Sequence, residues 1–163
     1  MRHDAFLPAV VALALVAGCE SSPKQAEPKK TPEPTAGKTL YERLGGEPAL
    51  VAVVDDFVAR GAADPRVNFT RKGSGQEWPA TPGNVMRLKM LLVQFIASAT
   101  GGPQKYTGRS MPETHKGMKI TDAEFDALAS DLKASLDKLK VPQQEQAELM
   151  MIVGSTRSQI VGK

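Results

Sequence analysis

The sequence has very few of the side chains on which most catalytic and metal sites are built. Its 163 residues include one cysteine, two histidines and one tryptophan. A single cysteine cannot form a disulfide within the chain, and it excludes a zinc site made of several cysteines. One histidine is His3, so His115 is the only imidazole in the body of the chain. Sites that need several histidines, or a cysteine nucleophile with a histidine base, are therefore excluded.

The sequence also lacks an apolar run long enough to span a bilayer. Its longest run, from Ala5 to Ala17, has about 13 residues, whereas a spanning helix needs about 20. The run follows Arg2, which favours a signal peptide. It ends in LVAGC, which resembles the bacterial lipoprotein box, whose cysteine, here Cys19, is acylated. We therefore expect a signal peptide over residues 1–18 and a lipid anchor that tethers the chain to a membrane, facing the periplasm, with the outer membrane favoured.

The charged residues form no basic block. The formal net charge is +3, and the lysines and arginines are scattered among acidic residues without interleaved aromatics, so we do not expect a nucleic-acid partner. Residues 20–37, ESSPKQAEPKKTPEPTAG, contain no aliphatic side chain larger than alanine. Because such a segment has nothing to bury, we expect a lipidated Cys19 followed by a disordered linker to residue 37, and one domain over 38–163.

The domain shows helical patterns and no convincing strand, which predicts the all-α class. Thr39 with Glu42 and Thr121 with Glu124 fit capping boxes at helix starts. Helices are expected from Thr39, from Glu47, over 84–100 with Asn84 as the N-cap, over about 110–116, from Thr121 and from Val141. Residues 66–83 hold three glycines and two prolines after Lys72, which indicates a long loop with a functional or mobile role.

The expected helix over 84–100 is unusually apolar. Its apolar side chains cover most of its circumference: Val85, Met86, Leu88, Met90, Leu91, Leu92, Val93, Phe95 and Ile96. Such a helix is either enclosed in the core or packed on an apolar group that the chain does not supply. Haem is such a group, and it asks the protein for one axial base and a flat apolar cleft. A lone histidine is more often structural, so a haem-free helical envelope lipoprotein is the alternative.

Four segments occur in the order of a known family: TLYERLGGEPAL, VVDDFVARGAADPRV, ATGGPQKYTGRSMPETHKGMKITDAEFDAL and VPQQEQAELMMIV. Together they resemble the group I truncated haemoglobins over residues 39–161. The resemblance implies a two-over-two helical sandwich that binds haem b and reversibly takes up O₂, NO or CO. It makes His115 the proximal iron ligand, with its second ring nitrogen donating to a backbone carbonyl.

The resemblance also implies a haem pocket lined by apolar side chains. Phe57 would form the distal wall, and Phe69 would stack near the macrocycle. Further cofactor contacts would come from Phe95, Met111, Met118, Ile120, Phe125, Leu128 and Val153. Each is also an ordinary core residue by its spacing, so these roles rest on the resemblance alone.

The distal side departs from the family pattern. Many members have a tyrosine where this chain has Val58 and a glutamine where it has Leu92, and Leu88 lies one turn earlier. None of these three side chains can donate a hydrogen bond. Bound dioxygen normally gains about 1–3 kcal/mol from a donor, so the loss predicts roughly 5- to 100-fold faster O₂ release.

Two alternatives for the distal side are open. The loop over residues 70–83 could supply a polar group such as Gln76 or Trp78, although a solvated loop anchored by its tryptophan is the simpler interpretation. Alternatively, Met86 or Met90 could act as a sixth iron ligand, which would favour a redox or gas-sensing protein. NO detoxification or peroxidase-like activity would need an unidentified electron donor, so enzymatic activity is left open.

Overall fold

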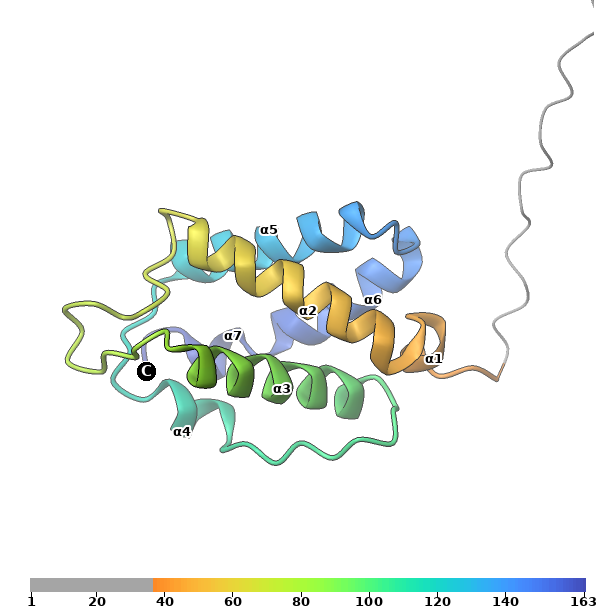
Figure 1. Cartoon of the computed structure of the whole chain (residues 1–163), viewed down its shortest axis with the longest axis horizontal. Coiled ribbons are helices and arrows are strands. Elements are labelled where there is room, and N and C mark those ends of the chain that lie inside the picture. Colours follow the sequence, from red (N-terminus) through yellow and green to blue (C-terminus); the bar gives the residue numbers. More distant parts are fainter. Residues whose placement is uncertain (1–36) are drawn as a thin grey trace, which may run out of the picture. The chain divides into compact units, whose positions relative to one another are not determined.

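The computed structural model describes residues 37–163 (Figure 1). The expected signal peptide, Cys19 and nearly all of the expected linker lie outside these residues. The helices are α1 (Leu40–Arg43), α2 (Gly46–Ala63), α3 (Pro82–Ala99), α4 (Met111–His115), α5 (Asp122–Lys138), α6 (Gln143–Ser155) and α7 (Arg157–Ile160). No strand occurs within the described part of the chain, which confirms the all-α class. None of these seven helices is long and apolar enough to cross a bilayer.

The four long helices pack as two pairs (Figure 1). α2 packs on α3 and α5 packs on α6, while α2 also packs on α5 and so joins the pairs. The short helices attach at the edges, because α1 contacts α2 and α6, and α4 contacts α7. This arrangement is the two-over-two helical sandwich that the sequence predicted.

The core is formed by buried side chains of α2, α3, α5 and α6. Leu50 and Val54 of α2, Leu136 of α5 and Leu149 of α6 are almost completely covered. Gly61 lies inside α2 and is also buried, because a Cβ there would lie 2.7 Å from Cδ1 of Leu128. The missing side chain lets α2 and α5 approach closely at this point.

Most of the expected helix starts are confirmed, and one is wrong. Thr39 and Thr121 form complete capping boxes as predicted. α3, however, begins at Pro82, and its N-cap is Thr81, whose hydroxyl accepts a hydrogen bond from the Asn84 amide over 3.3 Å. Proline is favoured at the first helical position because its missing N–H is not needed there, which is why the helix begins before Asn84.

The sequence predicted one helix after Val141, but the structure has two. α6 ends at Ser155, and α7 begins at Arg157 after a break at Thr156, whose amide donates to the Val153 carbonyl over 3.0 Å. α7 lies beside α4, the helix that carries His115. The short α7 therefore supports the candidate site directly.

Candidate functional site

His115 is the last residue of α4, a helix of five residues. The helix begins with a capping box, in which the Ser110 hydroxyl accepts from the Glu113 amide and the Glu113 carboxylate accepts from the Ser110 amide. Hydrogen bonds from Ser110 hold the pKa of Glu113 below its usual range. The helix cannot continue past Gly117, which has a φ of +80°. Strong signals on both sides therefore fix the end of α4 at the imidazole.

The His115 ring is half-buried and has a defined orientation. Its Nδ1 lies 2.8 Å from the Met111 carbonyl oxygen. A carbonyl can only accept, so Nδ1 carries the proton and Nε2 keeps its lone pair. Burial lowers the pKa of His115, and the hydrogen bond to Met111 opposes this only in part. The ring is therefore neutral near pH 7, with one nitrogen free to bind a metal. This bond is the one to a backbone carbonyl that the family resemblance implied.

Eleven of the thirteen residues expected to contact haem are only half-buried. Val58 and Phe125 are buried, and the other eleven are half-buried. Those eleven are Phe57, Phe69, Leu88, Leu92, Phe95, Met111, His115, Met118, Ile120, Leu128 and Val153. The core itself is well covered, yet these apolar side chains stay half-exposed. A flat apolar ligand would cover such side chains. Their chemistry, together with the free Nε2, fits haem.

Aromatic contacts fix several of these side chains. The rings of Phe95 and Tyr106 meet edge to face with centroids 5.8 Å apart, which joins α3 to the segment before α4. The Arg157 guanidinium lies 4.5 Å from the centroid of the Phe125 ring. Because α7 already covers part of Phe125, this ring has less surface for a ligand than its neighbours.

The expected distal residues lie on two helices. Val58 is buried on α2, while Leu88 and Leu92 are half-buried on α3 and pack against the core. A glutamine or tyrosine would add a donor at these positions, but valine and leucine add none.

The 70–83 loop does not follow the polar alternative raised by its sequence. Trp78 meets Phe69 edge to face, with ring centroids 5.6 Å apart, and is half-buried. Gln76 lies against Gly117, two residues after His115, and therefore on the α4 side rather than beside Leu88 and Leu92. The simpler interpretation, a loop anchored by its tryptophan, agrees with the Trp78 contact.

The two methionines considered as a sixth ligand line a different surface. An open groove of about 580 Å³ lies between α2 and α3. Val51 lies on its α2 side, and Met86 and Met90 lie on its α3 side, exposed by 72% and 49%. None of the thirteen expected haem contacts lines this groove. On a helix, Met86 lies about 160° from Leu88, so the methionines do not share the face of the distal leucines.

Residues 37–163 contain no cluster of three or more histidine, cysteine, aspartate or glutamate side chains that could hold a metal ion. Haem would bring its iron with four ligands already in place and would need from the chain only an axial base such as His115.

Sequence reasoning missed one part of the site region. Arg71 forms an ion pair with Glu124, with Nη1 and Oε1 2.7 Å apart, and so joins the 70–83 loop to the start of α5. Glu124 was recognised only as a capping residue. The pairing of residues 53 positions apart leaves no local signal in the sequence.

Comparisons with known proteins agree with this geometry. The family model described as bacterial-like globin matches residues 39–161. A group 1 truncated haemoglobin from Tetrahymena thermophila is 34% identical over 125 residues, which cover 77% of this chain and 96% of the relative.

Two solved structures are similar in fold and sequence. The truncated haemoglobin of Tetrahymena pyriformis in its Fe(III) form has a TM-score of 0.67 and 33% identity, covering 77% of this chain and all of that one. The 2/2 haemoglobin of Synechococcus sp. PCC 7002, solved in the cyanomet state with covalently attached haem, has a TM-score of 0.65 and 30% identity, with the same coverage. With the helical sandwich and the free imidazole nitrogen of His115, these similarities show that the chain belongs to the bacterial-like globins and, among them, to the truncated haemoglobins.

Proposed function

We propose that this truncated globin holds one haem b through Nε2 of His115 and offers a diatomic ligand an apolar distal pocket. When bound, haem supplies an iron centre that takes up O₂, NO or CO reversibly. The observation that carries the proposal is the hydrogen bond from Nδ1 of His115 to the Met111 carbonyl, because it leaves Nε2 unprotonated on a half-buried ring.

His115 contributes orientation as well as a ligand atom. Its Nδ1–H bond to Met111 fixes the tautomer and restrains rotation of the ring. Such a bond also raises the basicity of the opposite nitrogen, which strengthens its bond to a metal. The apolar side chains on either side supply the burial that retains a porphyrin.

The distal residues determine which ligand is retained. Val58, Leu88 and Leu92 exclude water from the pocket but donate no hydrogen bond. O₂ depends on a donor far more than CO does, since it gains more polar character when it binds. We therefore infer a globin that releases O₂ quickly and favours O₂ little over CO. These properties suit short-lived binding of diatomic gases better than O₂ storage.

We also propose that the globin works at the cell envelope, tethered through Cys19. The support is the LVAGC segment directly after an apolar run, followed by a proline-rich segment that separates it from the globin domain. The globin domain would then face the periplasm.

A haemin titration tests the haem proposal. The protein should bind one haemin with a sharp Soret band, and His115→Gly should lose that band or shift it, with added imidazole restoring it. Met86→Leu provides the matched control, because Met86 lies in the groove away from His115 and should leave the spectrum unchanged. A wild-type protein that leaves haemin free in solution would reject the proposal.

A further inference from the structure

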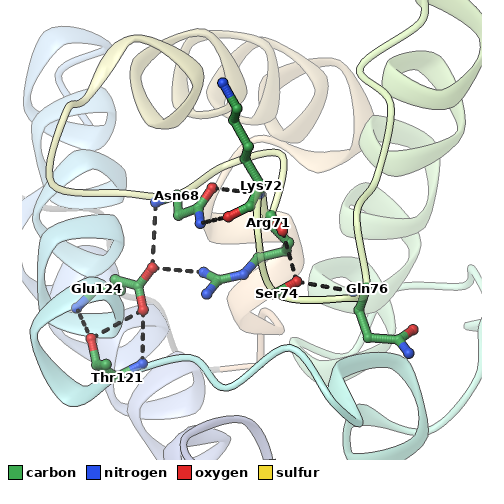
Figure 2. A network of polar contacts seen from close by, with 7 residues as sticks. All are labelled: Asn68, Arg71, Lys72, Ser74, Gln76, Thr121 and Glu124. Atoms are coloured by element: carbon green, nitrogen blue, oxygen red, sulfur yellow. Dashed lines mark hydrogen bonds and ion pairs between the residues drawn. The ribbon is translucent and has the colours of Figure 1, made fainter.

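The loop between α2 and α3 is ordered by its own hydrogen bonds (Figure 2). The side chain of Asn68 donates to the Lys72 carbonyl over 3.0 Å and accepts from the Lys72 amide over 2.9 Å. The Trp78 amide donates to the Thr70 carbonyl over 2.9 Å, which closes the base of the loop. The loop is therefore a closed turn with fixed geometry. Such a loop can hold the segments that it contacts in fixed positions relative to one another.

The first attachment of this loop is the ion pair between Arg71 and Glu124. One carboxylate oxygen of Glu124 accepts from the Thr121 amide over 2.9 Å, and the other accepts from Nη1 of Arg71 over 2.7 Å. The Arg71 and Glu124 side chains are only 11% and 16% exposed. Burial alone would raise the pKa of Glu124, but hydrogen bonds from Thr121 and Arg71 outweigh it and hold the pKa below its usual value.

Arg71 depends on this ion pair for its hydrogen bonding more than Glu124 does. Among residues 37–163, Glu124 supplies the only acceptor bonded to the Arg71 guanidinium, and the buried Nε of Arg71 has no partner. Glu124, by contrast, keeps its bonds from Thr121 whatever happens to Arg71. Removing the charge of Glu124 therefore leaves a buried cation uncompensated, which is the costlier loss.

The backbone of Arg71 supports the same conclusion. Its φ is +54°, a left-handed conformation that costs a residue with a side chain free energy. A non-glycine residue persists in this conformation only when surrounding contacts enforce it, and the ion pair is such a contact.

The second attachment lies on the opposite side of the loop. Figure 2 shows Gln76 pointing away from Glu124. A Cβ at Gly117 would lie 2.9 Å from Cγ of Gln76, so the Gln76 side chain rests directly on the Gly117 backbone. Gly117 belongs to the turn after α4, in which the Met118 amide donates to the His115 carbonyl over 3.0 Å. The loop thus contacts the turn that begins at the proposed iron ligand.

We propose that Arg71, Glu124 and Gln76 are positioning residues for His115, because they hold the α2–α3 loop as a strap between the start of α5 and the turn after α4. The inference rests on the proposed haem function. A helix of five residues has too few internal hydrogen bonds to hold its own position, so α4 depends on its neighbours. α7 supports it on one side, and the strap restrains the turn where α4 ends.

Four variants and one control test this proposal. Arg71→Asn removes the charge but keeps a residue type that tolerates a positive φ, and Arg71→Lys keeps the charge. Glu124→Gln keeps an oxygen for the capping bonds, while Gln76→Ala removes the second attachment. Arg66→Gln is the matched control, because Arg66 is 61% exposed and pairs with Asp64 in the same connection rather than with Glu124.

Three measurements separate positioning from simple folding. The first is emission from Trp78, the only tryptophan of the chain, in the haem-free protein. The second is the rate of haemin transfer to an excess of acceptor protein, and the third is the iron–imidazole stretching band of the ferrous protein. We expect Arg71→Asn to lose haemin about 10-fold faster, as for a lost hydrogen bond to a charged group, and Glu124→Gln to lose it faster still.

The remaining variants sharpen the test. Both charge-removing variants should shift the iron–imidazole band and make Trp78 easier to quench with acrylamide. Gln76→Ala should shift the band in the same direction, and Arg71→Lys should restore most of the wild-type behaviour. Arg66→Gln should stay within about 2-fold of wild type in haemin loss, because the Arg66 side chain is 61% exposed and is not bonded to Glu124 or to the turn after α4.

The outcomes separate this inference from the haem proposal. A wild-type protein that binds no haemin would overturn both. If the wild type binds haemin while Arg71→Asn and Glu124→Gln leave both the rate of haemin loss and the iron–imidazole band unchanged, the strap alone is overturned. A change in Trp78 emission without a change in the band would also overturn it, because the loop would then be loosened without moving His115. If Glu124→Gln does not fold, the pair Arg71→Asn and Arg71→Lys decides.

Discussion

The imidazole of His115 combines burial with a single fixed hydrogen bond. Burial disfavours the protonated ring, and the Met111 carbonyl selects the tautomer with Nε2 free. These two effects act together, since a protonated or rotated ring could not bind iron.

This residue should make the haem-free protein less stable in mild acid. The pKa of the folded ring lies below its ordinary value near 6.5, so in the window below about pH 6.5 the unfolded chain binds a proton that the folded chain refuses. As pH is lowered through that window, the free energy of unfolding should therefore decrease. It should stop decreasing once the pH is below the pKa of the folded His115 ring. Urea unfolding of wild type and His115→Gln at several pH values checks this, since the difference in their free energies of unfolding should stop changing with pH above about 7.5. A wild-type stability that falls relative to His115→Gln as pH rises through the window would contradict the lowered pKa.

The distal position Leu92 should control how long O₂ is retained. Leu92→Gln introduces a donor at a half-buried site, and such a bond contributes about 1–3 kcal/mol, so O₂ release should slow by roughly 5- to 100-fold. Stopped-flow displacement of O₂ by CO measures the rate. Leu92→Met adds no N–H or O–H donor and serves as the control. Equal O₂ release from the glutamine and methionine variants would show that Leu92 does not face the ligand.

Sequence patterns predicted the structural role of a residue where that role depends on residues nearby in the sequence. The Ser110 and Thr121 starts and the stop at Gly117 follow from spacing within one turn, so His115 could be placed at the end of a short helix. The ion pair of Arg71 with Glu124 could not be predicted, because it depends on how distant segments meet. The contact of Gln76 with Gly117 likewise depends on how distant segments meet, so the sequence left the position of Gln76 open.

At the scale of elements, α5 is the helix that joins the two halves of the sandwich. It packs on both α2 and α6, and Leu136 is completely buried between them. Its capping box also carries the strap through Glu124, so one helix supports the core and the candidate site.

Truncation of Leu136 should therefore destabilise the whole fold. Leu136→Ala leaves a cavity in the core, and we expect a loss of about 2–5 kcal/mol in the free energy of unfolding. Leu139→Ala is the matched control, because Leu139 is 40% exposed just after the same helix and should change stability by less than about 1 kcal/mol. Urea denaturation followed by circular dichroism measures both. Similar losses in the two variants would place the core elsewhere.

The presence of each long helix was easier to predict than its first and last residues. Periodic apolar residues on one face identified α2, α5 and α6, while α3 was recognised as a helix that is apolar around most of its circumference. The start of α3 was misplaced because two N-cap candidates, Thr81 and Asn84, flank the same turn, and the decisive signal was Pro82. The break between α6 and α7 was missed because Gly154, the next-to-last residue of α6, is followed by Ser155, Thr156 and Arg157, which are all compatible with a continued helix.

At the scale of the whole molecule, the proposed tether predicts where the protein is found. Cys19→Ser should move the globin from the membrane fraction to the soluble fraction, because acyl chains supply the membrane affinity. Fractionation followed by immunoblotting measures this, with Ser21→Ala as a control that leaves the cysteine intact. A Cys19→Ser protein that still sediments with membranes would contradict lipidation.

The first turn of the globin has a mechanical consequence for a tethered protein. Arg43 of α1 bonds to Glu145 and Glu148 of α6, and the Tyr41 amide donates to the Thr100 carbonyl at the end of α3 over 2.9 Å. A pulling force that entered through the N-terminal segment would load these bonds first and would be shared between α3 and α6. The short α4 would be spared, so movement of the surrounding lipid should leave the iron ligand undisturbed.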